Sequence, residues 1–363
     1  MLFASIALIV LSAYSILIVT FTIGWKRIPY FEQKENSNPM LNISVVVACR
    51  NEEQNLYQLL AALKNQTTSA FELVLVNDHS TDNTRKVMES VKSDFADIVI
   101  LDAEGSGKKQ ALKQGILSAK GDLIITTDAD CIPVSTWIET IGDFQLEFPS
   151  DLIICPVSMS GENTTFDTLQ QFEFTTLVAS GAGAAGVNMP IMCNGANLAF
   201  TKDAWLNSQH DLHDEQISGD DMFLLLSIKK RRGVIRFLKS SEAFVYTSTA
   251  PTLKSFIRQR QRWTSKSTVY TDWQVIFTAC TVFLVSLIQI ALLAFAIYDL
   301  SYLYLFVVVF VVKYLADLLL LSKVSGFFEL KHTIVNAFML SLLYPFYIVV
   351  VAITGLISKP TWR

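Results

Sequence analysis

Two acidic side chains follow an apolar run that is typical of a buried strand. Asp128 and Asp130 close the sequence Thr126-Thr-Asp-Ala-Asp130, directly after that run. Two carboxylates one residue apart can both reach a single hard cation, and magnesium and manganese prefer oxygen ligands of this kind. The sequence therefore predicts a Mn²⁺ or Mg²⁺ site at Asp128 and Asp130. The alternative is a pair of solvated loop acids.

Further acidic residues occur after a second apolar run and before a third. Asp78 could accept the imide N–H of uracil, although this polar stretch could instead cap a helix. Asp220 and Asp221 lie immediately before an apolar run, where two acids would suit the positive end of a helix dipole. Asp221 could alternatively act as a general base that deprotonates an acceptor hydroxyl. Both interpretations stay open at this point.

A basic stretch and an amide-rich turn are the other candidate sites. Arg258-Gln-Arg-Gln-Arg-Trp263 precedes an apolar segment, as expected of a helix at a membrane interface. Alternatively, Arg262 could neutralise a leaving diphosphate, with Trp263 forming a wall of the acceptor site. Within Cys193-Asn-Gly-Ala-Asn-Leu198, the residues Asn194, Gly195 and Asn197 would allow a sugar to approach closely. An ordinary tight loop is the alternative.

The elements that would position these residues alternate between strands and helices. Strands are expected at 43–48, 71–76, 97–101 and 122–127, with helices at 51–64 and 108–119. This alternation predicts an α/β fold with a mostly parallel sheet, whose ligands bind beyond the carboxyl ends of the strands. The chain has no GxxxxGK[ST] loop and no GxGxxG after the first strand, which weakens simple phosphate-loop and dinucleotide interpretations.

Long apolar segments flank this region. The composition is 51% hydrophobic, and uncharged or nearly uncharged runs occur at 2–24, 274–298, 302–321 and 334–358. Each is long enough to cross a bilayer, so one N-terminal and about three C-terminal transmembrane helices are predicted. Lys26 and Arg27 follow the first run and favour a cytosolic location for the next residues. A signal peptide is the alternative there, and Pro345 could make the last segment kinked or re-entrant.

Two charged residues fall inside the third apolar segment. Lys313 and Asp317 are spaced i, i+4 and would share one helix face. They could form a self-neutralising structural pair, or they could contact the head group of an acceptor.

Charge and cysteine usage exclude other classes of protein. The net charge of −4 gives no reason to expect a nucleic-acid partner. The five cysteines are scattered and form no CxxC pair, so neither a disulfide framework nor a zinc site is indicated.

Taken in order, these motifs resemble the membrane-bound family 2 glycosyltransferases, which include cellulose, hyaluronan and chitin-oligomer synthases and ceramide glucosyltransferase. The resemblance covers about residues 40–322. It implies a GT-A fold, which is a nucleotide-binding α/β domain. It also implies an inverting, metal-dependent transfer of a sugar from a nucleotide sugar.

The resemblance assigns the nucleotide site to matching positions. Ala48-Cys-Arg-Asn-Glu52 occupies the place of the family's P-T-Y-N-E loop, so Arg50 stands where the family has an aromatic residue. Asn77-Asp78 occupies the place of the family's D-D, with the first acid absent. Gly107–Gly115 looks like the family's GKxxAlxxG segment. The nucleotide-binding residues implied in this way are Ala48, Arg50, Glu52, Asp78, Lys108 and Asp128.

The remaining matches concern the chemistry and the acceptor. Asp220-Asp221 matches the family's E-D pair, which implies that Asp221 is the base. Gln259-Arg-Gln-Arg262-Trp263 matches QxxRW in full. The implied catalytic residues are Asp221, Asp220, Arg262 and Trp263, and the implied sugar or acceptor contacts are Asn194, Gly195, Asn197 and Gln259.

These observations predict three parts of the chain. Residues 1–25 form a transmembrane helix, and 26–272 form a cytosolic catalytic domain with interfacial helices at about 165–186 and 252–272. Residues 273–363 form the C-terminal membrane region, in a bacterial inner or plasma membrane. The expected reaction moves a sugar, favoured as a UDP-sugar, to a hydroxyl of a membrane lipid. Alternatives are a processive synthase of a β-linked polysaccharide, a nucleotidyltransferase or polyprenyl-phosphate sugar transferase, and a non-catalytic membrane scaffold.

Overall fold

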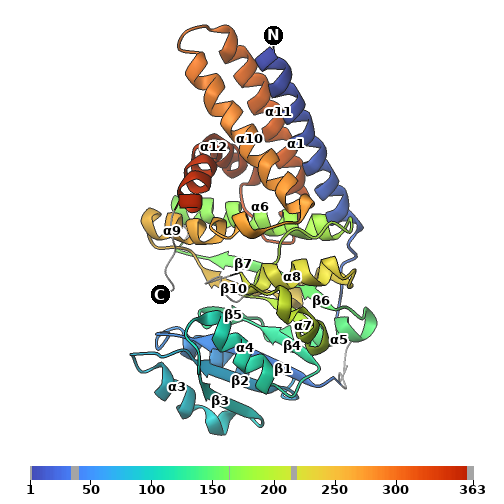
Figure 1. Ribbon diagram of the computed structural model, residues 1–363, viewed down its shortest axis with the longest axis vertical. Coiled ribbons are helices and arrows are strands. Elements are labelled where there is room, and N and C mark those ends of the chain that lie inside the picture. The colour runs from blue at the N-terminus through green and yellow to red at the C-terminus, as the bar shows by residue number, and fades with distance from the viewer. Residues whose placement is uncertain (1, 34–40, 163, 214–218, 358–363) are drawn as a thin grey trace. The chain divides into compact units, whose positions relative to one another are not determined.

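The computed structural model describes residues 2–33, 41–162, 164–213 and 219–357 (Figure 1). The chain divides into two compact units. The sheet unit comprises Pro29–Ser160 and Met192–Ser248, and the helical unit comprises Met1–Ile28, Gly161–Ile191 and Thr249–Pro360. The last residues of the predicted C-terminal region, 358–363, lie outside the described residues.

The sheet unit has an α/β fold with a mostly parallel main sheet, as predicted. Among the described residues this sheet has seven strands in the order β3-β2-β1-β4-β8-β6-β9. Its strands are β1 (Ile43–Cys49), β2 (Glu72–Asn77), β3 (Ile98–Asp102), β4 (Leu123–Thr126), β6 (Leu152–Ile154), β8 (Leu198–Thr201) and β9 (Ile235–Phe237). The first four strands run parallel, whereas β8 runs antiparallel to both β4 and β6.

A smaller sheet and a set of helices complete this unit. The smaller sheet has the order β5-β10-β7 within the described residues, with β5 (Cys131–Pro133), β7 (Val157–Ser160) and β10 (Val245–Ser248). The helices are α2 (Leu56–Lys64), α3 (Thr84–Ser90), α4 (Lys108–Ser118), α5 (Trp137–Glu147), α7 (Lys202–Ser208) and α8 (Asp220–Lys230). Because β5 begins one residue after Asp130, the acidic segment lies between β4 and the smaller sheet.

The core of the sheet unit explains why the central strands are so apolar. Val45, Val46 and Val47 of β1 are all fully buried, which means that both faces of this strand are covered. Such burial is typical of a central parallel strand with helices on its faces. The β-branched run predicted as the first strand is therefore confirmed.

One predicted helix begins later than expected. The segment predicted as helix from residue 51 becomes helical only at Leu56. Asn51 has a φ of 54°, in the left-handed region. The backbone N–H of Glu52 donates to Thr84 Oγ1 at 2.8 Å, and that of Glu53 donates to Asp82 Oδ2 at 3.2 Å. These residues therefore join two loops instead of starting a helix.

The helical unit contains the apolar segments predicted to cross a membrane. Among the described residues, four helices are long and apolar enough to do so, one near the N-terminus and three near the C-terminus. They are α1 (Leu2–Arg27), α10 (Trp273–Phe295), α11 (Ser301–Val324) and α12 (Thr333–Ile357). Their length and composition support an integral membrane protein. Pro345 lies inside α12, which is assigned as one continuous helix.

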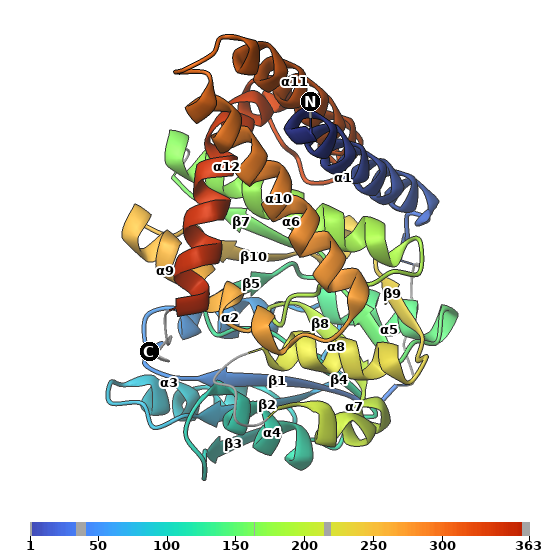
Figure 2. The ribbon, with the colours of Figure 1, turned by 45° about the horizontal axis from the view of Figure 1, so that its top comes forward.

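Two further helices belong to this unit and correspond to the segments predicted as interfacial. They are α6 (Thr165–Ala185) and α9 (Leu253–Thr264), which lie near α12 (Figure 2). Thr164 and Asp167 form a capping box at the start of α6. Glycine lets α1 approach α6 closely, because a Cβ added at Gly24 would lie 1.8 Å from the backbone oxygen of Gly183. Contact of α6 or α9 with a bilayer surface stays a prediction.

Lys313 and Asp317 of α11 form a paired network with α1. Lys313 Nζ donates to Asp317 Oδ2 at 2.6 Å, and the Tyr14 hydroxyl of α1 donates to Asp317 Oδ1 at 2.5 Å. The Lys313 ammonium also lies 5.1 Å from the ring centroids of Tyr14 and Tyr344. This network supports the structural interpretation of the pair, since both charges have partners inside the helix bundle.

Candidate active site

The site is built where three parallel strands end together. Cys49 at the end of β1 pairs in register with Asn77 at the end of β2, and Val46 pairs with Thr126 at the end of β4. Residues that follow these strands must therefore emerge at one edge of the sheet. The sequence places Arg50, Asp78 and Asp128 in these positions, as expected for a ligand site in an open α/β sheet.

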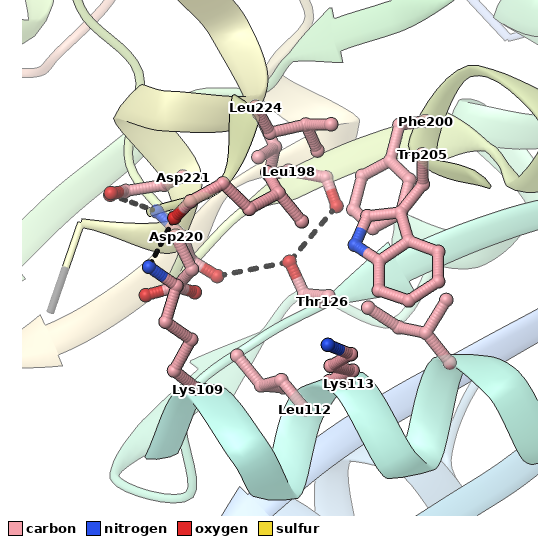
Figure 3. Close-up of a pocket in the computed structure, with 13 residues that line it drawn as sticks. Lys109, Leu112, Lys113, Thr126, Leu198, Phe200, Trp205, Asp220, Asp221 and Leu224 are labelled. Atoms are coloured by element: carbon pink, nitrogen blue, oxygen red, sulfur yellow. Dashed lines mark hydrogen bonds between the residues drawn. The ribbon is translucent and has the colours of Figure 1, made fainter. Parts of the chain in front are cut away.

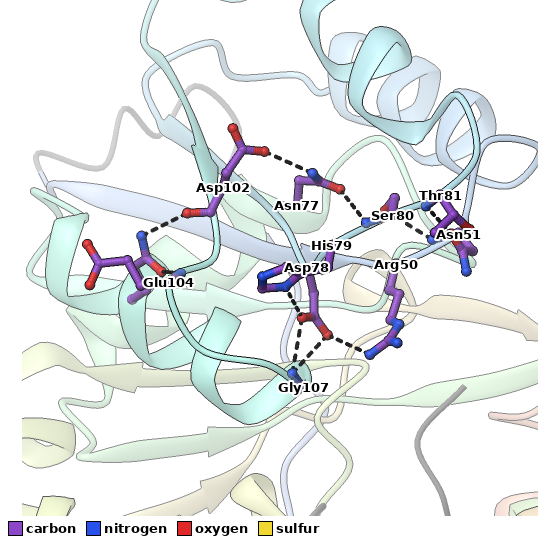
Figure 4. A network of polar contacts seen from close by, with 11 residues as sticks. Arg50, Asn51, Asn77, Asp78, His79, Ser80, Thr81, Asp102, Glu104 and Gly107 are labelled. Atoms are coloured by element: carbon purple, nitrogen blue, oxygen red, sulfur yellow. Dashed lines mark hydrogen bonds and ion pairs between the residues drawn. The ribbon is translucent and has the colours of Figure 1, made fainter.

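Side chains fasten the loops after β1 and β2 to each other (Figure 4). The backbone N–H of Asn51 donates to Ser80 Oγ at 3.1 Å, and the N–H of Thr81 donates to Asn51 Oδ1 at 2.8 Å. Asn77 donates through Nδ2 to Asp102 Oδ1 at 2.8 Å. The residue that replaces the family's first acid thus ties β2 to the end of β3.

Asp78 is buried and its negative charge is compensated within the protein. Its side chain is 1% exposed, and both of its oxygens accept from the backbone N–H of Gly107, at 3.0 and 3.1 Å. Arg50 Nη1 lies 3.5 Å from Oδ2, and His79 Nδ1 lies 3.2 Å from Oδ1. Gly107 has a φ of 101°, a conformation that glycine adopts without strain. Contact of Asp78 with a nucleobase stays a prediction.

The other two residues assigned to the first loop are less buried than Asp78. Ala48 and Glu52 are half-buried. The pKa of Glu52 is raised, first by burial and then by the nearby negative charges of Asp130 and Asp128, although a hydrogen bond from Asn55 opposes the shift. Glu52 therefore belongs to the same electrostatic neighbourhood as the two acids that follow β4.

Lys108 brings the acidic positions together electrostatically. It begins α4 and forms an ion pair with Asp128. The pKa of Lys108 is raised because the attraction of Asp128, Asp220 and Asp221 outweighs the effect of its burial. Acids almost a hundred residues apart in sequence are therefore neighbours of one ammonium group. Convergence of Asp78, Asp128, Asp130 and Asp221 with Arg262 around one cleft stays a prediction.

Asp128 and Asp130 supply a donor set that suits a divalent cation. Ligand atoms of Asp128, Asp130 and Cys131 lie within 4.8 Å of one another. The pKa of Asp130 is raised, first by loss of hydration among neighbouring protein groups and then by the charge of Asp128, although the side chain still reaches solvent. A divalent cation would relieve this repulsion. Two hard carboxylate oxygens fit Mg²⁺ or Mn²⁺ better than the single buried thiol does.

Asp221 lies in the first turn of α8, where its carboxylate is fixed by two backbone groups. Oδ1 accepts from the N–H of Met222 at 2.7 Å, and Oδ2 accepts from the N–H of Gly195 at 3.1 Å. The thiol of Cys193 also donates to the Asp221 backbone oxygen at 3.3 Å. The amide-rich turn at 193–198 is thus the direct neighbour of the predicted base.

A small pocket opens beside these residues (Figure 3). Its enclosed volume is about 30 Å³. Its walls are mainly apolar side chains of α4, β8, α7 and α8, joined by Thr126, Asp220 and Asp221. We interpret it as a packing gap behind the acids.

Sequence reasoning missed Lys109, which supports this corner of the unit. Its side chain is 6% exposed, donates to the backbone oxygens of Leu212 and His213, and lies 4.9 Å from the ring centroid of Phe223. In the sequence, helical spacing is the only signal for this role of the lysine that follows Lys108. Lys109 shares the inner face of α4 with Leu112 and Ile116.

The two amides of the turn at 193–198 differ in their surroundings. Asn194 is half-buried and accepts from the N–H of Ala196 at 3.0 Å. Asn197 is fully buried. Its Nδ2 donates to the backbone oxygens of Pro156 and Ala243, and its Oδ1 accepts from Trp137 Nε1 at 2.8 Å. The side-chain amide of Asn197 thus has its hydrogen-bond partners inside the protein, so we do not include Asn197 in the proposed sugar site.

The remaining predicted site residues belong to the helical unit. Gln259, Arg262 and Trp263 lie on α9, all of them half-buried. The Trp263 ring packs against Phe174 of α6, with a centroid distance of 6.1 Å. A meeting of these residues with the acids of the sheet unit stays a prediction.

Comparison with known proteins finds a family model that matches part of the chain. Residues 44–204 match the family model described as "Glycosyl transferase family 2". This range includes β1 to β4 and both Asp128 and Asp130, but it ends before Asp221 and α9.

Two bacterial relatives match over shorter segments. Undecaprenyl-phosphate 4-deoxy-4-formamido-L-arabinose transferase of Proteus mirabilis is 40% identical over 93 residues, which are 24% of this chain and 28% of that protein. Poly-beta-1,6-N-acetyl-D-glucosamine synthase of Staphylococcus aureus is 31% identical over 97 residues, which are 27% of this chain and 24% of that protein. The chain thus matches less than a third of the length of either relative.

A solved structure shares the fold over most of the chain. The mannosyltransferase PcManGT of Pyrobaculum calidifontis, solved with GDP-Man and Mn²⁺, aligns with a TM-score of 0.57 and 14% identity. The alignment covers 94% of this chain and 99% of that one. At this identity the likeness concerns the fold alone. Residues 44–204 are therefore similar to family 2 glycosyltransferases, in a chain whose described residues also include four helices able to cross a membrane.

Proposed function

We propose that this protein transfers a sugar from a nucleotide sugar to a hydroxyl group of a membrane lipid. The observation that carries the proposal is the ion pair of Lys108 with Asp128 inside the segment that matches family 2, with the negative charges of Asp220 and Asp221 acting on the same ammonium group. A cation next to several acids, at the carboxyl ends of parallel strands, suits a reaction that handles a diphosphate and a proton together. The four apolar helices favour an acceptor that resides in the bilayer.

The residues of the sheet unit divide into a donor side and a proton-accepting side. Arg50, Glu52, Asp78 and Lys108 would bind the nucleotide, with Ala48 and Gly107 shaping the loops. Asp221, with Asp220 beside it, would take the proton from the acceptor hydroxyl as that oxygen attacks the anomeric carbon. Attack from the side opposite the leaving group would invert the anomeric centre in one displacement.

Asp128 and Asp130 would hold Mn²⁺ or Mg²⁺, which when bound would neutralise charge on the diphosphate. Lys108 would release part of its interaction with Asp128 when the diphosphate arrives, because phosphate oxygens offer it a second anionic partner. Arg262 of α9 would add a further positive charge at the leaving group, and Gln259 and Trp263 would contact the acceptor.

The chain topology that we propose places residues 26–272 on the cytosolic side. Lys26 and Arg27 lie in the last turn of α1, and Lys323 lies in the last turn of α11. Such basic residues favour the cytosolic side of a membrane helix. Activated sugars would then be available to the site.

A second candidate is a processive synthase of a β-linked polysaccharide. Its support is the 31% identity to a segment of a poly-N-acetylglucosamine synthase. The two candidates differ in product, since a single transfer gives a discrete glycolipid and a processive enzyme gives a polymer.

Product analysis tests both candidates. The full chain, purified with lipid from its source membrane, is incubated with a panel of UDP- and GDP-sugars and Mn²⁺. The proposal predicts a lipid whose mass rises by one sugar residue, with release of one nucleoside diphosphate per transfer. A ladder of sugar masses would support the synthase instead. Failure to consume any of the nucleotide sugars would contradict both.

A further inference from the structure

A buried arginine lies inside the QxxRW segment at one of its variable positions. Arg260 of α9 is 2% exposed, and Glu173 of α6 is 3% exposed. Arg260 Nε donates to Glu173 Oε1 at 3.3 Å, and Nη2 donates to Oε2 of the same carboxylate. The guanidinium and the carboxylate therefore form a two-point ion pair within the helical unit. Such a pair fixes orientation as well as distance.

The third nitrogen of Arg260 holds the first residue of the motif. Nη1 donates to Gln259 Oε1 at 2.7 Å. Because a guanidinium carries only donors, the amide oxygen of Gln259 must face it, and the amide nitrogen must face the other way. In the part of the chain that the structure describes, no hydrogen bond donated by Gln259 Nε2 is found. The contact thus turns Gln259 into a donor aimed away from Arg260.

Arg260 also contacts the last residue of the motif. Its guanidinium carbon lies 4.1 Å from the ring centroid of Trp263 and 4.7 Å from that of Phe256. Residues 256, 260 and 263 follow one face of a helix at i, i+4 and i+7. A cation over the indole face holds the ring in one orientation.

The carboxylate that anchors Arg260 is itself held by a third helix. The hydroxyl of Tyr347 in α12 donates to Glu173 Oε1 at 3.0 Å. Glu173 thus accepts from two helices, α9 and α12, and lies on a third, α6 (Figure 2). A buried charge pair contributes little net stability by itself, but it can specify one arrangement among several.

We propose that Arg260 is a positioning residue for the acceptor. Anchored on Glu173, it presents the amide nitrogen of Gln259 as a hydrogen-bond donor and sets the plane of the Trp263 ring. The group bound there is an oxygen atom that accepts a hydrogen bond and lies next to an apolar or sugar surface. A lipid hydroxyl is such a group. This inference rests on the proposed transferase function, and it concerns acceptor binding only.

The test compares the substitution Arg260→Lys with a matched control. Lysine keeps the positive charge, but a single ammonium cannot bond both Glu173 oxygens and Gln259 in one plane. The control is Gln261→Leu, which removes the 2.9 Å hydrogen bond from Gln261 Nε2 to Thr354 Oγ1 and so breaks a different contact between α9 and α12. Each variant is assayed with vesicles of total lipid from the source membrane as the acceptor.

Arg260→Lys should raise the acceptor KM by about tenfold or more, comparable to the effect of losing a residue that orients a metal ligand. Hydrolysis of the nucleotide sugar by water, which needs no acceptor lipid, should stay close to the wild-type rate. Gln261→Leu should lower thermal stability without raising the acceptor KM. In a Gln259→Ala background, Arg260→Lys should raise the acceptor KM less than it does alone.

Two results would overturn the inference: an unchanged acceptor KM in Arg260→Lys, or an equal loss of transfer and hydrolysis. If Arg260→Lys does not fold, Tyr347→Phe removes one bond to Glu173 with little loss of packing. A raised acceptor KM in that variant supports the inference, and an unchanged one overturns it. A wild-type protein that consumes nucleotide sugar but glycosylates no lipid would contradict the proposed function itself. If the wild type glycosylates lipid and Arg260→Lys has the same acceptor KM, only this inference is contradicted.

Discussion

The carboxylate of Asp221 accepts a hydrogen bond from the backbone N–H of Gly195, with Oδ2 and N separated by 3.1 Å. The bond joins the first turn of α8 to the turn before β8. It fixes the orientation of Asp221 through a backbone group, so side-chain substitutions in that turn can leave the orientation intact. Substitutions in this turn can therefore distinguish an effect on ligand contact from an effect on folding.

Gly195→Ala tests whether a ligand approaches this turn. A Cβ at position 195 would lie 3.5 Å from Asp221 Cβ, which is ordinary van der Waals contact, so the protein itself has room for it. We expect unchanged thermal stability and a KM for nucleotide sugar or acceptor raised about tenfold, equivalent to about 1.4 kcal/mol of binding free energy. Gly195→Pro, which removes the N–H that holds Asp221, serves as the comparison and should lower kcat. A fully active Gly195→Ala would place the sugar elsewhere.

Asn197→Ala and Asn194→Ala form a matched pair of substitutions in the same turn. Loss of the Asn197 amide leaves Trp137 Nε1 and two backbone oxygens without these partners inside the core. Each buried group left unsatisfied costs roughly 1–3 kcal/mol, so unfolding should need several kcal/mol less free energy. Asn194→Ala should unfold close to wild type and affect activity instead. Thermal unfolding of both variants in detergent measures the difference, and equal stability would contradict the structural role of Asn197.

Metal removal should abolish transfer. The pKa of Asp130 is raised first by burial and then by the negative charge of Asp128, and a bound divalent cation would offset both effects. Chelation by EDTA is expected to stop transfer, and Mn²⁺ or Mg²⁺ should restore it. Asp130→Asn should raise the metal concentration needed for half-maximal activity by more than about tenfold, because it removes a charged ligand. Cys131→Ser, the neighbouring control, should not; full activity of Asp130→Asn after chelation would remove the metal from the proposal.

The paired charges of α11 should matter for stability and not for transfer. Lys313→Met would leave Asp317 without its ammonium partner, and breaking a buried pair costs roughly 3–5 kcal/mol. The double variant Lys313→Met/Asp317→Leu should recover much of that loss, because no buried charge remains. Resistance to unfolding by SDS reports stability for both variants. A stable double variant that no longer glycosylates lipid would instead favour the head-group interpretation.

The sequence was sufficient to predict the features that have a strong local signal. The run of valines in β1 predicts a strand buried on both faces, and uncharged or nearly uncharged runs of twenty or more residues predict the membrane helices. The edge of the sheet that carries Asp78 and Asp128 follows from parallel strands, since their carboxyl ends must meet.

Other features depend on contacts between distant residues. Strands β6, β8 and β9 have only three or four residues each, too few to show a period, so the continuation of the sheet through the antiparallel strand β8 was not predicted. The buried arginine of α9 is Arg260, which lies at a variable position of QxxRW. The spacing of the motif does not reveal this burial. Helical spacing from Phe256 to Arg260 and Trp263 was the available signal.

The central claim is that Asp221 removes the proton from an acceptor hydroxyl during sugar transfer. The most direct measurement is the rate of transfer of labelled sugar from nucleotide sugar to lipid by wild type and by Asp221→Asn, together with the affinity of each for the nucleoside diphosphate. We predict a transfer rate at least about 100-fold lower in Asp221→Asn, as expected for loss of a general base, with nearly unchanged nucleotide affinity. A turnover close to wild type in Asp221→Asn would contradict the account.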